Sequence, residues 1–325
     1  MNWKVKKMAS KPVTEIAQAT PKKKRGWHRF IKSLPLTIMA LPAVIYIFIF
    51  NYIPLYGLLL PFKDYKPRLG FFGSEWVGLK NFKFLLNNDQ LIKAVSNTIL
   101  YNIVFILLGT AVTLAVALML YEMSKRSVKI YQTAIFVPHY ISWVVAAYVF
   151  MVFLDMDYGI LNKIITAFGG DPILWYNDPK YWPPILTIAH IWKGFGYSAV
   201  IYYAALMGLD KSLFEAAELD GANKLQQMWH ISLPGIKNMI VMLFIMHIGK
   251  VFHGDFGMFY NISQNSSLLY ETTDIIDTYI YRTLINLGDV GISSAVSMLQ
   301  AVLGFILVIV SNAIANKVDK DSALY

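Results

Sequence analysis

The chain has 325 residues, of which 56% are hydrophobic and 15% are charged, whereas about 25% of the residues of a soluble domain are charged. Its mean hydropathy of +0.48 and its apolar blocks of about 20 or more residues exclude an ordinary soluble enzyme. A net charge of +9 would favour nucleic-acid binding in a soluble chain, but ten of the basic residues lie in the first 33 positions, as expected for a topology signal. The composition predicts a multi-span membrane protein with no nucleic-acid partner.

Motifs for bond chemistry are missing from the sequence. The chain contains no cysteine, which removes disulfides, thiolate metal sites and cysteine nucleophiles. It contains neither a GxxxxGKS or GxxxxGKT phosphate loop nor an HExxH zinc motif. The stretch from Asp155 to Thr166 begins like a calcium loop, but its glycine comes one position early and Thr166 replaces the final carboxylate. We expect no catalytic residue, no metal site and no cofactor on this chain.

Six apolar stretches are long enough to cross about 30 Å of hydrocarbon as helices. The fifth is the most polar of them, since it contains His247, Lys250, His253 and Asp255. Omitting it would place the two chain ends on opposite faces of the membrane. The expected fold class is therefore an all-α membrane protein with six transmembrane helices. The predicted spans are 34–60, 95–121, 130–154, 184–207, 236–258 and 291–315.

The distribution of basic residues predicts the orientation. With both ends inside, 18 Lys and Arg lie in inside segments and nine in outside segments, counting Lys237 at the membrane boundary as inside. The first span lacks a small-residue cleavage site and is expected to be retained as a signal anchor. We predict a basic cytoplasmic tail over 1–33, a transmembrane domain over 34–316 and a cytoplasmic tail over 317–325.

The predicted cytoplasmic connection 208–235 is longer than a turn between two helices requires. Ser212 and Glu215 have the spacing of a capping box, which predicts a short helix starting there. Gly221 can take the left-handed conformation that ends such a helix. The first half of this loop is therefore expected to be a short helix followed by a glycine hinge.

The second half of the same loop repeats the cap signal. Asn223 and Gln226 predict a second helix, which is expected to end before Pro234. A small hairpin cannot bury all of its own apolar residues, so this one is expected to dock into another surface. These apolar residues are Leu213, Phe214, Ala217, Leu225, Met228 and Trp229.

The same residues carry a resemblance to a known family. Glu215-Ala216-Ala217 is followed after three residues by Gly221 and after nine more by Ile231-Ser232-Leu233-Pro234. This spacing resembles the EAA signature of ABC importer permeases. The stretches Trp76–Phe82, Ser96–Thr98, Asp157–Gly159 with Asn162, and Leu209–Lys211 are similar to the carbohydrate (maltose-type) branch of that family, in particular to permeases for complex oligosaccharides.

The resemblance implies a type I ABC importer permease fold and a set of partners in a bacterial inner membrane. These would be a second permease subunit forming a heterodimer, two ATP-binding subunits that hold ATP and magnesium, and an extracytoplasmic solute-binding protein. The loop would enter a groove on an ATP-binding subunit, with Glu215 as a charged contact and Gly221 as a hinge. The implied ATPase-coupling residues are Glu215, Ala216, Ala217, Gly221, Leu225, Met228 and Trp229.

Cationic residues mark the two spans that flank this loop. A lysine exposed to lipid near the bilayer centre costs about 2.5 to 3.5 kcal/mol, so Lys193 and Lys250 should face protein or water. Each belongs to a stripe with i, i+3, i+4, i+7 spacing, which places its members on one helical face. These predicted substrate-pathway residues are His190, Lys193, Gly194 and Tyr197 on the fourth span and His247, Lys250, Val251 and Gly254 on the fifth.

The resemblance implies that the spans flanking the loop line a sugar site. Gly194 and Tyr197 match the maltose-type pattern in residue type, whereas the two lysines and two histidines replace neutral groups by cations. We therefore predict an acidic oligosaccharide, such as alginate or another uronate fragment, which would make the chain the first permease subunit of such an importer.

Two other readings of the same residues stay open. The lysines and histidines can instead be structural, with hydrogen bonds to neighbouring helices. Lys250 would then either pair with Asp255 or snorkel outward. The spans and charges would also suit an ATP-independent secondary transporter or channel for a small anionic solute. The EAA-like loop is the feature that separates the importer from this alternative.

Overall fold

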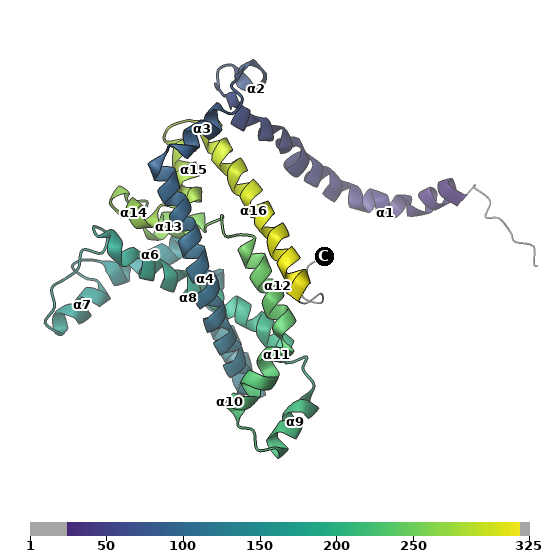
Figure 1. The fold of residues 1–325 in the computed structure, drawn as a ribbon, viewed down its shortest axis with the longest axis vertical. Helices are drawn as coiled ribbons and strands as arrows, with labels where there is room; N and C mark the ends of the chain where they lie inside the picture. Colours follow the sequence, from purple (N-terminus) through teal and green to yellow (C-terminus); the bar gives the residue numbers. More distant parts are fainter. Residues whose placement is uncertain (1–24, 319–325) are drawn as a thin grey trace, which may run out of the picture. The chain divides into compact units, whose positions relative to one another are not determined.

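The computed structural model describes residues 25–318, which form helices and one very short β-hairpin (Figure 1). Contacts divide the chain into two units, residues 1–57 and 58–325. Most of the two predicted cytoplasmic tails, residues 1–24 and 319–325, lies outside the described residues.

The first predicted span is helical but irregular. Helix α1 (Arg25–Ile47) continues into a π-helical turn (Phe48–Tyr52) and a 3-10 helix (Ile53–Phe62). The apolar stretch is Leu34–Phe62, and none of its most apolar window is buried inside the chain. Its side chains are therefore available to lipid or to another subunit. The helix begins at Arg25, nine residues before the predicted start of the first span at residue 34.

The second unit contains the remaining elements. Its two strands pair antiparallel, with Lys63 opposite Trp76. Its elements are β1 (Lys63–Asp64), α2 (Gly70–Gly73), β2 (Glu75–Trp76), α3 (Lys80–Leu86), α4 (Asp89–Glu122), α5 (Lys125–Tyr140), α6 (Trp143–Leu154), α7 (Ile160–Ala167), a 3-10 turn (Pro179–Tyr181), α8 (Trp182–Leu206), α9 (Lys211–Leu219), α10 (Lys224–Gln227), a π-helical turn (Met228–Ser232), α11 (Leu233–Gly235), α12 (Lys237–Ile248), α13 (Phe256–Ile262), a 3-10 turn (Ser267–Leu269), α14 (Tyr270–Thr273), α15 (Ile276–Ile285) and α16 (Val290–Val318).

Length and composition identify three helical stretches that can cross a membrane: Leu34–Phe62, α4 and the Val290–Ile314 part of α16. Two bent helix pairs raise this number to five within the described residues if each pair is counted as one span. The predicted fourth span corresponds to α8, which has 25 residues but includes His190 and Lys193 and is not among these stretches. The helical regions thus agree with the six predicted stretches. Some of these stretches, however, are not single continuous helices.

The third predicted span is not a single helix. Helices α5 and α6 are bent by 98° at a short break. Pro138 lies near the end of α5 and cannot donate the backbone hydrogen bond that a continuous helix needs. Ser142 then caps α6 by accepting the Val145 N–H at 3.3 Å. Apolar composition did not reveal this break because only Ile141 and Ser142 separate the two helices.

The fifth predicted span is also broken, and the prediction of one helix over 236–258 is wrong. Helix α12 ends at Ile248, and residues 249–255 are irregular before α13 begins. The Asn102 amide of α4 donates to two carbonyls of this segment at 3.0 and 3.1 Å. The Gln300 amide of α16 donates to a third at 2.6 Å, and Asp277 accepts the Gly254 N–H at 2.7 Å. These bonds replace the helical ones.

The unbroken helices α4 and α8 pack along each other and form the centre of the unit (Figure 1). Trp182 and Leu186 of α8 are fully buried together with Met258 and Phe259 of α13. Removing such large apolar surfaces from water or lipid contact stabilises the position of α13 against α8. This core therefore fixes α8 relative to the broken fifth span.

A buried ion pair holds α15 in place. The Arg282 guanidinium donates to both oxygens of Asp274, at 3.1 and 2.6 Å, and the two side chains are 17% and 7% exposed. The Tyr270 ring lies 4.1 Å from the guanidinium carbon. Thr98 of α4 accepts the Ile276 N–H at 2.9 Å, which ties the start of α15 to α4.

We predict that Arg282→Met lowers the Tm of the detergent-solubilised transporter, because Asp274 would lose its cationic partner at a buried position. The expected destabilisation is about 3 to 5 kcal/mol. The control is Lys93→Met, since the Lys93–Glu271 pair joins side chains that are 56% and 65% exposed and such a pair contributes little. Equal changes in Tm for the two variants would contradict the assignment.

Candidate functional site

The loop after α8 folds as a helical hairpin, as the sequence predicts. Its first helix, α9, starts one residue before the expected cap, because Asp210 and not Ser212 caps it by accepting the Ser212 N–H at 3.0 Å. The backbone and side-chain hydrogen bonds from Ser212 hold the pKa of Asp210 below its usual value. The carboxylate is therefore charged at neutral pH and suits the positive end of the helix.

Gly221 makes the turn between the two helices. Its φ is +82°, a conformation that side chains with a Cβ rarely adopt. The capping box of Asn223 and Gln226 is confirmed by both of its bonds, at 2.9 and 2.8 Å. The prediction that the second helix ends before Pro234 is wrong: helical turns continue to Gly235, with the proline early in α11, where its missing N–H is tolerated.

The hairpin leaves much of its apolar surface uncovered within the chain. Phe214 is half-buried, and its ring lies 5.6 Å from that of Tyr121 at the end of α4. Glu215 and Ala216 are exposed, while Ala217 and Met228 are half-buried. Four large side chains are more than half exposed: Leu213 (53%), Leu219 (90%), Leu225 (64%) and Trp229 (64%).

An exposed ion pair lies at the base of the hairpin. The Lys224 ammonium lies 2.6 Å from Glu218 and 3.8 Å from Glu122 at the end of α4. Its hydrogen bond to Glu218 holds the pKa of that carboxyl below its usual value. The Gln227 side chain is buried and donates to the Ala222 carbonyl at 3.1 Å. The hairpin is thus internally braced and joined to the core helix α4.

The predicted stripe on the fourth span lies on one helix, α8, but its members have different surroundings. The His190 ring stacks on Phe105 of α4, with ring centres 3.9 Å apart. Tyr197 is 47% exposed and stacks on His139 at 4.8 Å. A Cβ added at Gly194 would meet nothing within 4 Å, so the surface beside it is open.

Lys193 is engaged with the break between α5 and α6. Its ammonium donates to the carbonyls of His139, at 2.9 Å, and of Ile141, with Pro138 at 3.5 Å. It also lies 5.2 Å from the centre of the Trp143 ring. These contacts favour the structural alternative for this lysine over direct contact with substrate.

The predicted helical stripe on the fifth span does not exist as one face, because α12 ends before three of its four members. Val251 uses its carbonyl to accept from Asn102, and Gly254 donates its N–H to Asp277. Asp255 accepts from the Trp143 indole at 2.6 Å. The partner of Asp255 is therefore Trp143 and not Lys250, which the structural alternative had paired with it.

Three of the predicted cationic residues nevertheless converge. His247 is near enough to His190 to act on it electrostatically, and Lys250 acts in the same way on His247. His247 and Lys250 are exposed within the chain, whereas His190 is half-buried against Phe105. This polar cluster, formed by His190 of α8, His247 of α12 and Lys250 just after α12, contains one ammonium and two imidazole rings.

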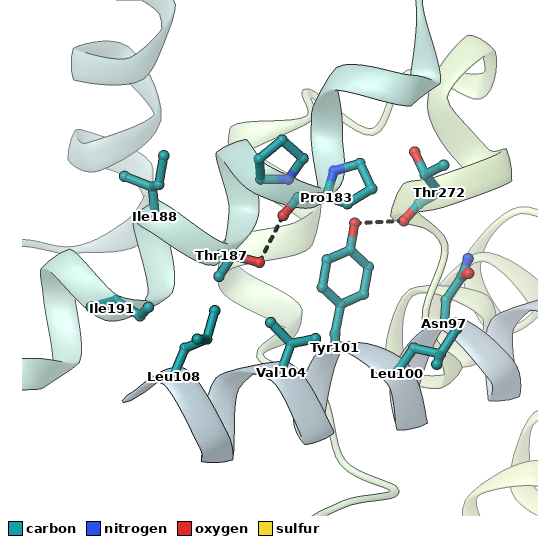
Figure 2. Close-up of a pocket in the computed structure, with 11 residues that line it drawn as sticks. Asn97, Leu100, Tyr101, Val104, Leu108, Pro183, Thr187, Ile188, Ile191 and Thr272 are labelled. Carbon is teal, nitrogen blue, oxygen red and sulfur yellow. Dashed lines mark hydrogen bonds between the residues drawn. The ribbon is translucent and has the colours of Figure 1, made fainter. Parts of the chain in front are cut away.

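Figure 2 shows a groove of about 690 Å³ between α4 and α8. Its polar groups are already paired: the Tyr101 hydroxyl donates to the Thr272 carbonyl at 2.9 Å and the Thr187 hydroxyl to the Pro183 carbonyl at 2.7 Å. Its remaining walls are aliphatic, including Leu108 and Ile188. A sugar needs hydrogen-bonding partners that this groove does not supply, and none of the predicted pathway residues lines it.

Within residues 25–318, no group of three His, Asp or Glu side chains is arranged to hold a metal ion. The stretch that begins like a calcium loop is a turn, in which Asp155 accepts the N–H groups of Asp157 and Tyr158 at 3.0 and 2.7 Å. Sequence analysis missed Asn102, Gln300 and their role in holding the broken fifth span. Their signal was an amide side chain inside an apolar span, which usually bonds another helix.

The protein is a membrane permease with the type I ABC importer fold, as its similarity to known proteins shows. Residues 109–320 match the family described as binding-protein-dependent transport system inner membrane component. The chain belongs to this family, and it is therefore a multi-pass membrane protein and a transport subunit.

Two relatives cover nearly the whole chain. The polygalacturonan/rhamnogalacturonan transport system permease protein YteP of Bacillus subtilis (strain 168) is 37% identical over 297 residues, which is 91% of this chain and 92% of that protein. Protein LplB of the same organism is 36% identical over 287 residues, or 88% of this chain and 90% of that protein.

Two solved structures have the same fold. A chain in the crystal structure of a bacterial ABC transporter involved in the import of the acidic polysaccharide alginate is 30% identical, with a TM-score of 0.82, covering 90% of this chain and 99% of that one. A chain of the bacterial alginate ABC transporter in complex with an alginate pentasaccharide-bound periplasmic protein is also 30% identical, with a TM-score of 0.82 and coverage of 91% and 99%. The protein is thus a permease subunit of a sugar or oligosaccharide ABC importer.

Proposed function

We propose that this permease subunit moves an acidic oligosaccharide, such as alginate or another uronate fragment, into the cytoplasm. The polar cluster of His190, His247 and Lys250 carries the proposal, because it places the Lys250 ammonium beside two imidazole side chains, whereas a neutral sugar needs only hydroxyl and amide partners. A carboxylate entering a site of low dielectric constant would form a charge-assisted hydrogen bond with Lys250. Because Lys193 bonds backbone carbonyls, we place Lys250 and the two histidines closer to the substrate than Lys193.

The relatives support an acidic substrate by their chemistry. One is named for polygalacturonan and rhamnogalacturonan, which contain galacturonic acid, and the similar solved transporters import alginate, an acidic polysaccharide. Gly194 and Tyr197, together with the backbone around Val251 and Gly254, would form the uncharged part of the same pathway.

The proposed assembly contains a second permease subunit, two ATP-binding subunits and an extracytoplasmic solute-binding protein. ATP and magnesium would bind the ATP-binding subunits, so this chain would need no cofactor and would perform no bond chemistry. Both termini would lie in the cytoplasm. The hairpin and the α3 region lie at opposite ends of α4 (Figure 1), as this topology requires. Membership of an ABC importer family does not support the ATP-independent alternative.

The hairpin is the proposed coupling element. Its exposed side chains, chiefly Leu213, Leu225 and Trp229, would fill a groove on an ATP-binding subunit, and Glu215 would make a polar contact at its edge. Ala216, Ala217 and Met228 would complete the contact surface. Closure of the ATP-binding subunits would push the hairpin and, through α8, switch the spans between outward and inward access.

We predict that Gly221→Pro or Glu215→Lys uncouples transport from ATP hydrolysis while leaving the membrane domain folded. Proline cannot adopt the positive φ of Gly221, and the reversed charge would disturb the docked edge. The measurement is the ratio of sugar transported to ATP hydrolysed by the reconstituted importer. Gly169→Pro is the matched control, because Gly169 also has a φ of +82° but lies outside the hairpin. Full coupling in both hairpin variants would show that the loop is a simple connector.

We predict that Lys250→Met reduces the response to acidic sugars selectively. Loss of one charge-assisted hydrogen bond should lower the response to the acidic sugar by about tenfold or more. The measurement compares ATPase stimulation by trigalacturonate and by its carboxyl-reduced counterpart, each delivered by the binding protein. Lys250→Arg should retain the preference, and Lys163→Met, which removes a charge from exposed α7, should not change it. An equal loss for both sugars would contradict a carboxylate contact.

A further inference from the structure

The ammonium of Lys193 sits where α5 ends and α6 begins. The last carbonyls of a helix have no partner within the helix and carry a partial negative charge. Lys193 donates to the carbonyl of His139, in the last turn of α5, and to that of Ile141, just after it; it also approaches the Pro138 carbonyl, which accepts the Ile141 N–H. A cation from α8 therefore replaces the hydrogen bonds that a continuous third span would have made.

Helices α5 and α8 also approach each other closely one turn away. A Cβ added at Gly196 would collide with the Ile135 carbonyl. The glycine thus permits backbone contact, and the packed pair brings Lys193 to the end of α5. The end of α5 is consequently fixed to α8 by both shape and charge.

On the other side of the break, Trp143 connects α6 to the break in the fifth span. Its indole N–H donates to Asp255 at 2.6 Å, and the same carboxylate caps α13 by accepting the Met258 N–H at 3.1 Å. A Cβ at Gly257 would lie 2.8 Å from the Trp143 ring. The Trp143 ring therefore packs closely against the first turn of α13, and Lys193 lies beside it.

We propose that Lys193 is a positioning residue that fixes the angle between α5 and α6 and joins the two broken spans into one unit. The unit consists of Lys193, the end of α5, Trp143 and Asp255. Because α8 leads directly into the hairpin, a displacement of the hairpin reaches both breaks through this unit. The proposal rests on transport by an importer and is independent of whether the sugar is acidic.

A spin-label distance tests the proposal in the complete transporter reconstituted with its partners. The absence of native cysteine allows labels at Thr133→Cys on α5 and Val152→Cys on α6, two exposed positions. Lys193→Met should shift or broaden the α5–α6 distance distribution before any sugar is added, whereas Lys193→Arg should retain it. Lys193→Met should also lower transport per ATP hydrolysed by about tenfold. The loss should be the same for trigalacturonate and for its carboxyl-reduced counterpart.

Trp143→Phe provides a second test if Lys193→Met fails to assemble. This substitution keeps an aromatic ring at the position but removes the indole N–H that Asp255 accepts. It should broaden the same distribution. Lys250→Met is the matched control and should leave the α5–α6 distance unchanged, even where it alters the response to acidic sugars. An unchanged distribution in Lys193→Met, or in Trp143→Phe where the first variant does not assemble, overturns the proposal. A neutral sugar preference in the wild type would overturn only the proposed substrate.

Discussion

Backbone groups inside a bilayer have no water to bond, so every break in a membrane helix needs partners from the protein itself. Two spans within residues 25–318 are broken at the positions described above, and side chains from unbroken helices meet the requirement there. Lys193 of α8 donates to backbone carbonyls at the break between α5 and α6. Asn102 of α4 and Gln300 of α16 donate to backbone carbonyls at the break between α12 and α13. The positions of the broken spans therefore depend on α4, α8 and α16.

This dependence gives the polar residues of the membrane domain different tasks. Lys193 and Asn102 bond backbone carbonyls and are committed to structure, whereas His247 and Lys250 are exposed near the irregular end of α12. Irregular backbone at membrane depth is tolerated where it is buried in protein or lines a cavity, and in transporters it often marks a substrate site. The exposed His247 and Lys250 are thus placed beside the kind of backbone segment at which a transported solute binds.

The sequence was sufficient for the locations of the helical regions, since these depend on apolar length, and for the hairpin, since Asn223, Gln226 and Gly221 act locally. It was insufficient for the breaks, because their partners lie far away: Asn102 bonds a segment almost 150 residues later. The cap at Asp210 was missed because Ser212 offered the same chemistry two residues on. Lys193 looked like a ligand for substrate because a sequence does not show that the carbonyls of His139 and Ile141 lie within its reach.

The most direct test of the account is uptake by the wild-type importer reconstituted in liposomes with its solute-binding protein. Labelled trigalacturonate and alginate trisaccharide would be compared with carboxyl-reduced trisaccharides of the same length. The account predicts ATP-dependent uptake of an acidic sugar, inhibited by unlabelled uronate fragments and weakened by salt, since the preference is electrostatic. Uptake of the neutral trisaccharides with no uptake of the uronates would contradict it.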